Sequence, residues 1–336
     1  MSPWTVLVAD IGGTHARFAL ARPGTESPLM PDSTAKFRVD AFASLADAAL
    51  HYLDGRDVQV QSAVLAVAGR VTGDEARITN HPWVISAERI RRVLALDHVH
   101  LVNDFAAQAM AVPLLGAADV TRIGAAEWTL PDEDPGAPHP DFTYAVIGPG
   151  TGLGVGALLR REGRLHALQT EGGHASFAPG TPEEIAVLQR LSGEFGRVSN
   201  ERIVSGGGLV NLHRALSALA GGETLGERPG PLRPEDVTER ARDGDPQCLH
   251  VIDMFCAVFG AAAGDLVLTL GAWDGVFLTG GVVNHVMPWL AHSGFRQRFE
   301  HKGRFAPAMA SVPTLAVSHP QPGLLGAANL AKYLHE

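Results

Sequence analysis

The sequence predicts an α/β protein of two domains, each with a mixed sheet flanked by helices. Two apolar strands, about half a chain apart, each end in a glycine-threonine turn, namely Gly12-Gly13-Thr14 and Gly150-Thr151-Gly152. A second apolar stretch follows each turn, at residues 17–21 and 154–159. A single hydrophobic core stops growing at ~250–300 residues, so two domains are expected in a chain of 336 residues.

The first half of the chain carries the signals of a mixed sheet rather than of alternating βαβ units. A helix pattern begins after Ser44, with Asp47 placed to complete a capping box, and another begins after Ser86. Hairpin strands followed by a strand–helix–strand order give a sheet that is part antiparallel and part parallel. The predicted strands lie at residues 6–9, 17–21, 35–39, 62–67 and 100–102.

The second half repeats this order of elements. Thr181-Pro182-Glu183-Glu184 is a strong helix start, with a Thr cap, Pro at the first helical position and Glu at the third. The predicted strands lie at residues 144–147, 154–159, 164–169 and 314–317. An amphipathic helix over residues 324–334 is expected to pack back on the first domain. We therefore predict a small α/β domain of residues 1–115 plus 318–336 and a large α/β domain of residues 116–317.

Composition excludes several classes of protein. The net charge of −9 argues against a nucleic-acid-binding surface, although backbone amides and a metal could still neutralise one phosphate ligand. Cys248 and Cys256 are predicted to be reduced, since eight residues along one helix hold their Cα atoms ~12 Å apart. The apolar run at residues 251–273 contains Asp253 and Asp265, which favours a buried helix that passes into a turn over a membrane span. The first strand begins near Trp4 and leaves no room for a signal peptide, so we expect a cytoplasmic protein.

The first turn indicates a phosphate site. A strand that ends in Gly-Gly-Thr offers backbone N–H groups and a hydroxyl with no Cβ in the way. Asp10 stands just before the glycine pair, where its carboxylate could hold hydrated Mg²⁺ beside the phosphates. The alternative is an Asp that forms the turn by bonding to its own backbone.

A second acidic residue follows the strand at residues 100–102. Asp104 precedes a helix expected to begin near Phe105, and it could take the proton of an acceptor hydroxyl, an effect worth roughly 10²–10⁴-fold. The alternative is that Asp104 is only the helix N-cap, a position that Asp favours.

Further polar and glycine-rich turns accompany these two acids. Glu171-Gly172-Gly173-His174 is expected to expose its acid and its histidine, which suits hydrogen bonds to a polyol, although His174 could also be an ordinary surface residue. The turns at residues 205–208 and 279–281 suit a nucleoside lying against backbone. The two glycine-threonine turns point to phosphoryl transfer, but the chain has no Walker phosphate loop and is therefore not a Walker-type NTPase. It also has no dinucleotide fingerprint and no zinc-ligand motif, which disfavours hydride chemistry and a zinc site.

Taken together, these motifs resemble the bacterial glucokinases of the proteobacterial type, in the actin-like ATPase/hexokinase superfamily. The likeness covers nearly the whole chain. The matching motifs, in chain order, are Asp10-Ile11-Gly12-Gly13-Thr14, Thr79-Asn80-His81-Pro82-Trp83, Val102-Asn103-Asp104-Phe105, residues 148–152, Glu171-Gly172-Gly173-His174, residues 205–209 and Gly323-Leu324-Leu325-Gly326.

The resemblance implies a two-domain actin-like ATPase (ribonuclease H-like) fold with a cleft between domains, and transfer of phosphate from ATP to the 6-hydroxyl of glucose. By this resemblance Asp104 is the catalytic base, Mg²⁺ is held near Asp10 through water, and the protein is a homodimer. The positions that match sugar ligands are Asn80, Asn103, Asp104, Glu171, His174 and Glu201. The positions that match nucleotide contacts are Ala9, Asp10, Ile11, Gly12, Gly13, Thr14, Gly150, Thr151, Gly207 and Gly281.

The chain departs from the family pattern at two positions, since His15 stands where the family usually has Asn and Ala9 where Gly is frequent. The related repressor/kinase family needs a cysteine-rich zinc motif, which two cysteines cannot supply. Three alternatives stay open at this point. They are a kinase for another hexose (mannose, fructose or an N-acetylhexosamine), a non-catalytic sugar-binding regulator, and an ATP-driven filament or chaperone of the same superfamily.

Overall fold

A computed structural model describes residues 4–78, 82–128, 140–221 and 232–334. The described residues form two compact units. The first holds the chain up to Asp119 together with residues 167–169 and the chain from His319, and the second holds residues 120–166 and 170–318.

The first unit is built on a five-stranded mixed sheet with the strand order β3-β2-β1-β4-β8. β1 is antiparallel to β2 and parallel to β4, and β8 continues the parallel part. This is the mixed arrangement that the hairpin and strand–helix–strand signals predict. The strands are β1 (Val6–Ile11), β2 (His15–Ala21), β3 (Ala35–Arg38), β4 (Ser62–Val67) and β8 (His98–Asn103).

Two of the helices of this unit begin at the predicted caps. The Ser44 side chain accepts a hydrogen bond from the Asp47 amide, and Ser86 accepts one from the Arg89 amide. The helices are α1 (Leu45–Leu53), α2 (Ala87–Val93), α3 (Asp104–Ala111) and α11 (Pro322–Leu334), with short 3-10 turns η1 (Val39–Ala41), η2 (Val112–Leu114) and η3 (Ala117–Asp119). A small antiparallel sheet completes the unit, formed by β5 (Val71–Thr72), β6 (Glu75–Arg77) and β7 (Val84–Ser86).

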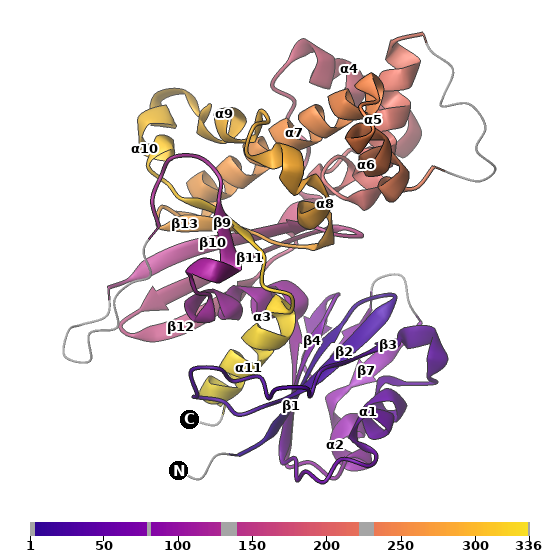
Figure 1. Ribbon diagram of the computed structural model, residues 1–336, viewed down its shortest axis with the longest axis vertical. Helices are drawn as coiled ribbons and strands as arrows, with labels where there is room; N and C mark the ends of the chain where they lie inside the picture. Colours follow the sequence, from indigo (N-terminus) through magenta and orange to yellow (C-terminus); the bar gives the residue numbers. More distant parts are fainter. Residues whose placement is uncertain (1–3, 79–81, 129–139, 222–231, 335–336) are drawn as a thin grey trace. The chain divides into compact units, whose positions relative to one another are not determined.

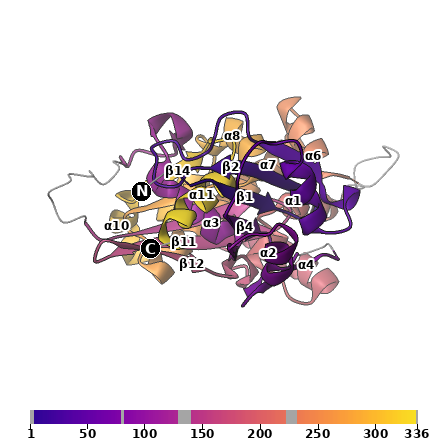
Figure 2. The ribbon, with the colours of Figure 1, turned by 90° about the horizontal axis from the view of Figure 1, so that it is seen from below.

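Helix α11 returns from the end of the chain to cover one face of this sheet, beside α3 (Figure 1, Figure 2). Its buried residues pack with Val6, Val8 and Val64 of β1 and β4. A Cβ added at Gly326 would lie 1.6 Å from the Ala107 carbonyl oxygen. The two helices therefore touch backbone to backbone at this point.

The second unit contains a six-stranded mixed sheet with the order β12-β11-β10-β13-β14-β9. β10 and β11 form an antiparallel hairpin, whereas β10, β13 and β14 run parallel. The predicted strands of this half are confirmed, with β10 and β11 each longer at both ends than the sequence pattern indicates. The strands are β9 (Val120–Arg122), β10 (Phe142–Pro149), β11 (Leu153–Arg161), β12 (Arg164–Gln169), β13 (Gly275–Leu278) and β14 (Thr314–Val317).

Within this unit the helices gather on one side of the sheet (Figure 1). The Thr181 cap predicted for α4 is present, since its side chain accepts a hydrogen bond from the Glu184 amide. The helices are α4 (Pro182–Phe195), α5 (Gly206–Leu219), α6 (Pro234–Arg242), α7 (Pro246–Leu270), α8 (Gly281–Leu290), α9 (Phe295–Glu300) and α10 (Ala306–Ala310), with 3-10 turns η4 (Gly172–His174), η5 (Asn200–Arg202) and η6 (Gly303–Phe305).

Helix α7 is the apolar segment that the sequence predicts to be a buried helix. Among the described helices it alone has the length and apolar composition of a membrane span, yet 67% of its most apolar window is buried inside the protein. It ends where Gly271 adopts a left-handed conformation (φ 67°), so the apolar run passes from a helix into a turn as predicted. Cys248 and Cys256 are both free and buried in this helix, as predicted.

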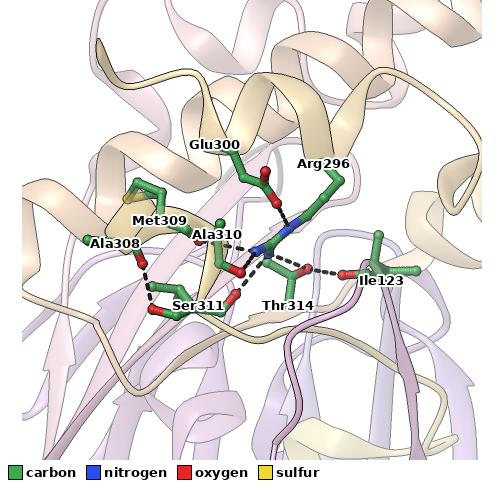
Figure 3. A network of polar contacts seen from close by, with 9 residues as sticks. Ile123, Arg296, Glu300, Ala308, Met309, Ala310, Ser311 and Thr314 are labelled. Carbon is green, nitrogen blue, oxygen red and sulfur yellow. Dashed lines mark hydrogen bonds and ion pairs between the residues drawn. The ribbon is translucent and has the colours of Figure 1, made fainter. Parts of the chain in front are cut away.

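Arg296 of α9 fixes the segment that leads from α10 into β14 (Figure 3). Its guanidinium lies beside the Glu300 carboxylate and donates hydrogen bonds to main-chain carbonyls near the end of α10. The acceptors are the carbonyl oxygens of Met309 (3.1 Å), Ala310 (2.9 Å) and Val312 (2.8 Å) and the hydroxyl of Thr314 (3.2 Å). One cation thus anchors β14 to the helical layer.

We expect Gly326→Ala to lower the stability of the first unit by about 1–3 kcal/mol, because α11 and α3 must separate to admit a methyl group. Thermal unfolding followed by circular dichroism measures the change. Gly193→Ala in α4 is the matched control, since nothing lies within 4 Å of the added Cβ there. The control should be neutral or stabilising, and an equal loss in both variants would contradict the close helix contact.

We expect His213 of α5 to make stability fall as the pH drops. Its ring is buried, and no described residue is a hydrogen-bond partner for its Nε2 atom. Burial, with a smaller contribution from Arg240, lowers the pKa of His213 below 6.5, while Asp245 opposes this shift. The unfolded chain therefore binds a proton that the folded chain resists, and stability is lost below about pH 6.5.

The measurement is the unfolding temperature of the wild type and of His213→Leu between about pH 7 and pH 5. The wild type should lose more stability over this range than the variant. Parallel curves for the two proteins would rule out His213 as the source of the pH dependence.

Candidate active site

Three parallel strand ends bring the first glycine turn and Asp104 to one edge of the five-stranded sheet. In the strand pairing, Ile11 lies opposite Val67 and Val67 lies opposite Asn103. The carboxyl ends of parallel strands meet at the same edge, which is where α/β proteins bind ligands. Two strand spacings, about 10 Å, separate the end of β1 from the end of β8.

Asp10 is held at this edge by an ion pair. Its Oδ2 atom lies 3.1 Å from Arg17 of the neighbouring strand, and its side chain is 23% exposed. Gly323, at the start of α11, packs so closely that an added Cβ would lie 3.0 Å from the Asp10 carboxyl carbon. Burial raises the pKa of Asp10, and the Arg17 charge and hydrogen bond oppose that shift.

The turn after Asp10 is closed by one hydrogen bond, from the Gly12 amide to the His15 carbonyl oxygen (2.9 Å). Among the described residues, no partner accepts a hydrogen bond from the amides of Gly13 and Thr14 or contacts the Thr14 hydroxyl. Thr14 is exposed and Gly13 is half-buried. These groups can therefore donate to a phosphate, as the sequence predicts.

The N-cap of α3 is Asn103, so the alternative that Asp104 serves as the cap is wrong. The Asn103 Oδ1 atom accepts hydrogen bonds from the amides of Phe105 (3.0 Å) and Ala106 (3.2 Å). Its Nδ2 atom donates to the Gly69 carbonyl oxygen (3.2 Å) and to Asp104 Oδ1 (3.0 Å). The Asn103 side chain is buried and makes four hydrogen bonds inside the protein, and its role as a sugar ligand stays a prediction.

Asp104 is the first residue of α3, at the end of β8, and it is half-buried. Its Oδ1 atom accepts hydrogen bonds from Asn103 Nδ2 and from the Phe105 amide (3.0 Å). The carboxylate is therefore positioned by its two neighbours in sequence. Asn80, another predicted sugar ligand, lies outside the described residues.

In the second unit, three glycine-containing segments meet at the carboxyl end of β10. A Cβ added at Gly148 would lie 2.4 Å from the Thr279 carbonyl oxygen, and one added at Gly280 would lie 2.5 Å from the Pro149 carbonyl oxygen. The Gly206 amide donates to the Gly150 carbonyl oxygen (2.8 Å). The predicted nucleotide turns of this half therefore form one structure.

Two helices begin at this point and present their amino ends. Gly207 lies in the first turn of α5 and Gly281 is the first residue of α8. Both are exposed, and Thr151 in the hairpin turn is exposed as well. Unpaired amides and the helix dipole make a helix amino end favourable for a phosphate.

The predicted sugar ligands of this unit gather next to the same hairpin. The Nδ1 atom of His174 lies 3.9 Å from Glu201 Oε1, with side-chain exposures of 57% and 29%. The other carboxylate oxygen, Glu201 Oε2, accepts a hydrogen bond from the Leu153 amide (2.9 Å). This bond anchors Glu201 directly after the turn formed by residues 150–152.

Glu171 and His174 are exposed, as the Glu-Gly-Gly-His motif predicts. The glycines between them allow η4 to lie against β11. A Cβ added at Gly173 would lie 1.9 Å from the Leu153 carbonyl oxygen, and one at Gly172 would lie 2.9 Å from the Val155 side chain. The two glycines thus fix where the acid and the histidine stand.

Sequence reasoning missed one residue in each unit, Arg17 in the first and Gly152 in the second. Arg17 pairs with Asp10, and the period of two along a strand could have indicated it, since Arg17 lies opposite Asp10 in the hairpin. The sequence pattern places Gly152 only in the turn, whereas in the structure a Cβ there would lie 2.4 Å from Glu201 Oε2. No local pattern indicates that contact, because 48 positions separate Glu201 from Leu153 in the sequence.

The described residues contain no group of three or more metal-ligating side chains. Asp10 nevertheless fits the predicted Mg²⁺ site. Mg²⁺ is often held by one or two carboxylates together with substrate phosphates and water. Only Oδ2 of Asp10 is used by Arg17.

Comparison with known proteins identifies the class of this enzyme. The glucokinase family model matches residues 7–334. A glucokinase of Stenotrophomonas maltophilia (strain R551-3) is 60% identical over 326 residues, which is 97% of this chain and 94% of that protein. The crystal structure of a glucokinase from an Antarctic psychrotroph has a TM-score of 0.82 and 33% identity, covering 97% of this chain and 98% of that one.

The fold also matches a more distant kinase. The structure of a ROK family glucokinase from Streptomyces griseus, in complex with glucose and AMPPNP, has a TM-score of 0.64 at 20% identity and covers 97% of this chain and 98% of that one. The matches confirm the predicted class, an ATP-dependent hexose kinase of the actin-like ATPase fold. Within that class, the chain belongs to the glucokinase family.

We expect Gly152→Ala to raise the KM for glucose by roughly 10–150-fold, since the methyl group displaces Glu201, a predicted sugar ligand, from its bond to the Leu153 amide, and one hydrogen bond to a charged group is worth about 1.5–3 kcal/mol. Steady-state kinetics with a coupled ADP-release assay measures the KM of both proteins.

A double-mutant cycle with Glu201→Ala supplies the control for this prediction. In that background Gly152→Ala should have little further effect on the KM for glucose, because the displaced group is gone. Independent, additive effects would show that Gly152 acts on something other than Glu201.

Proposed function

We propose that this chain transfers the γ-phosphoryl group of ATP to the 6-hydroxyl of D-glucose, with Asp104 as the general base. One observation carries the assignment of the base. Asp104 stands at the end of β8, on the same sheet edge as the turn at residues 12–14, and Asn103 and the Phe105 amide hold its carboxylate in place. Membership of the glucokinase family supports the substrate pair.

Asp104 would accept the proton of the sugar hydroxyl as the oxygen–phosphorus bond forms. Phosphoryl transfer needs little covalent help from the protein, so most of the catalysis would come from positioning and from neutralising charge. A carboxylate held in place by hydrogen bonds suits this role, because a general base must lie within hydrogen-bond distance of the proton that it takes.

Glu171, His174 and Glu201 would bind sugar hydroxyls. Support comes from their exposure and from the anchoring of Glu201 to the Leu153 amide. A site that offers a partner to each hydroxyl penalises sugars that lack one, because its polar groups are then left unpaired. The same roles are proposed for Asn80 and Asn103 by resemblance to the family.

The nucleotide phosphates would bind the amides of Gly13 and Thr14, and the amino ends of α5 and α8 would add further donors. Two observations support these assignments: among the described residues no acceptor pairs with the amides of Gly13 and Thr14, and Gly207 and Gly281 are exposed. Ala9, Ile11, Gly12, Gly150 and Thr151 are proposed contacts by resemblance. We further propose that Asp10 holds Mg²⁺ through water, where the ion would neutralise phosphate charge.

A cytoplasmic location and a homodimer are also proposed, on the family resemblance. Size-exclusion chromatography with light scattering tests whether the protein is a homodimer. The net charge of −9 supports a protein without a nucleic-acid partner.

We expect Asp104→Asn to lower kcat by ~10²-fold or more, since the amide cannot accept the proton. Glucose binding, measured by isothermal calorimetry, should change little. Asp97→Asn is the matched control, because Asp97 is exposed just before β8 and lies outside the proposed site. Near-normal turnover by Asp104→Asn would remove Asp104 as the base.

A panel of hexoses in the same assay tests the acceptor. Glucose should give the highest kcat/KM. A preference for mannose, fructose or an N-acetylhexosamine would overturn the glucose assignment, and glucose binding without ADP release would favour a regulator.

A further inference from the structure

His15 occupies a distinctive place beside the first phosphate turn. It is the first residue of β2, directly after Thr14, and its carbonyl oxygen accepts the Gly12 amide bond that closes the turn. Its side chain is half-buried, so the imidazole remains accessible to a ligand at the turn.

Strand register places His15 on a basic face of the sheet. Asp10 lies opposite Arg17, Arg17 lies opposite Lys36, and His15 lies opposite Arg38. Residues opposite one another, and residues two apart along a strand, point to the same face. His15, Arg17, Lys36 and Arg38 therefore share the face that carries the Asp10 carboxylate.

The charges on this face are only partly balanced. Arg17 is paired with Asp10, and Arg38 with Asp40. Lys36 is exposed and forms no ion pair with any described residue. Like charges directly opposite one another are unfavourable, so an anion on this face would relieve the repulsion.

These cations also act on the imidazole. Partial burial, and then the charges of Lys36, Arg17 and Arg38, lower the pKa of His15 below 6.5, and Asp40 weakly opposes them. The ring is therefore mostly neutral at pH 7 in the free protein. A phosphate beside the ring would add negative charge and favour the protonated ring.

We propose that His15 is a phosphate ligand that takes up a proton when the nucleotide binds at the turn of residues 12–14, so that nucleotide affinity falls as the pH rises. The inference rests on the proposed function, since it needs phosphates at this turn. It adds a pH dependence that an Asn, the usual residue of the family at this position, could not give.

The test compares the wild type with His15→Asn by isothermal titration of ADP in the presence of MgCl₂. Titrations between about pH 6 and pH 8, in buffers of different ionisation enthalpy, give the number of protons taken up. The wild type should take up more protons than the variant, and its Kd should rise more steeply with pH, by up to tenfold per pH unit. The ionisation of ADP itself cancels in the comparison.

A second variant keeps the test valid if His15→Asn folds poorly. Lys36→Gln removes an exposed charge that disfavours the imidazolium, so the pH range of proton uptake should move upward. Equal uptake in wild type and His15→Asn, or an unmoved range in Lys36→Gln, would overturn the proposal. Failure of glucose phosphorylation in the wild type would instead contradict the proposed function, so the two outcomes are distinguishable.

Discussion

The second unit depends on backbone segments that lie too close together for a side chain to stand between them. The carbonyl oxygen of Leu153 would be 1.9 Å from a Cβ at Gly173, and that of Thr279 would be 2.4 Å from one at Gly148. These approaches join the hairpin of β10 and β11 to η4 and to the segment before α8. Because the contacts are between main chains, they fix the turns of the candidate site more firmly than flexible side chains would.

In the first unit, the parallel strands set the positions of two carboxylates, and neighbouring residues set the electrostatic surroundings of each. The strand ends carry Asp10 and Asp104, and each carboxylate has a different support. Asp10 is paired with Arg17 across the hairpin, whereas Asp104 is held by hydrogen bonds from the residues beside it. The Asp10 carboxylate is therefore sensitive to nearby charges, as the His15 imidazole also is. The position of the Asp104 carboxylate depends mainly on local backbone geometry.

Much of the fold was predictable because its signals are local. Ser44, Ser86 and Thr181 cap their helices by bonds that span three residues. The mixed sheets followed from the order of hairpin and crossover patterns. The cap of α3 was less predictable, because Asn103 and Asp104 are both good N-cap residues and only the backbone conformation distinguishes them.

The sequence by itself determined the two strand–turn–strand units, the acids after β1 and β8 and the exposed Glu-Gly-Gly-His turn, because each depends on residues a few positions apart. Only the tertiary structure decided that Glu201 bonds to Leu153, that Gly326 lies against Ala107 and that Lys36 faces Arg17. Those contacts join segments that are distant in the chain or paired by register. Local preference carries no information about such contacts, since packing of the whole unit selects them.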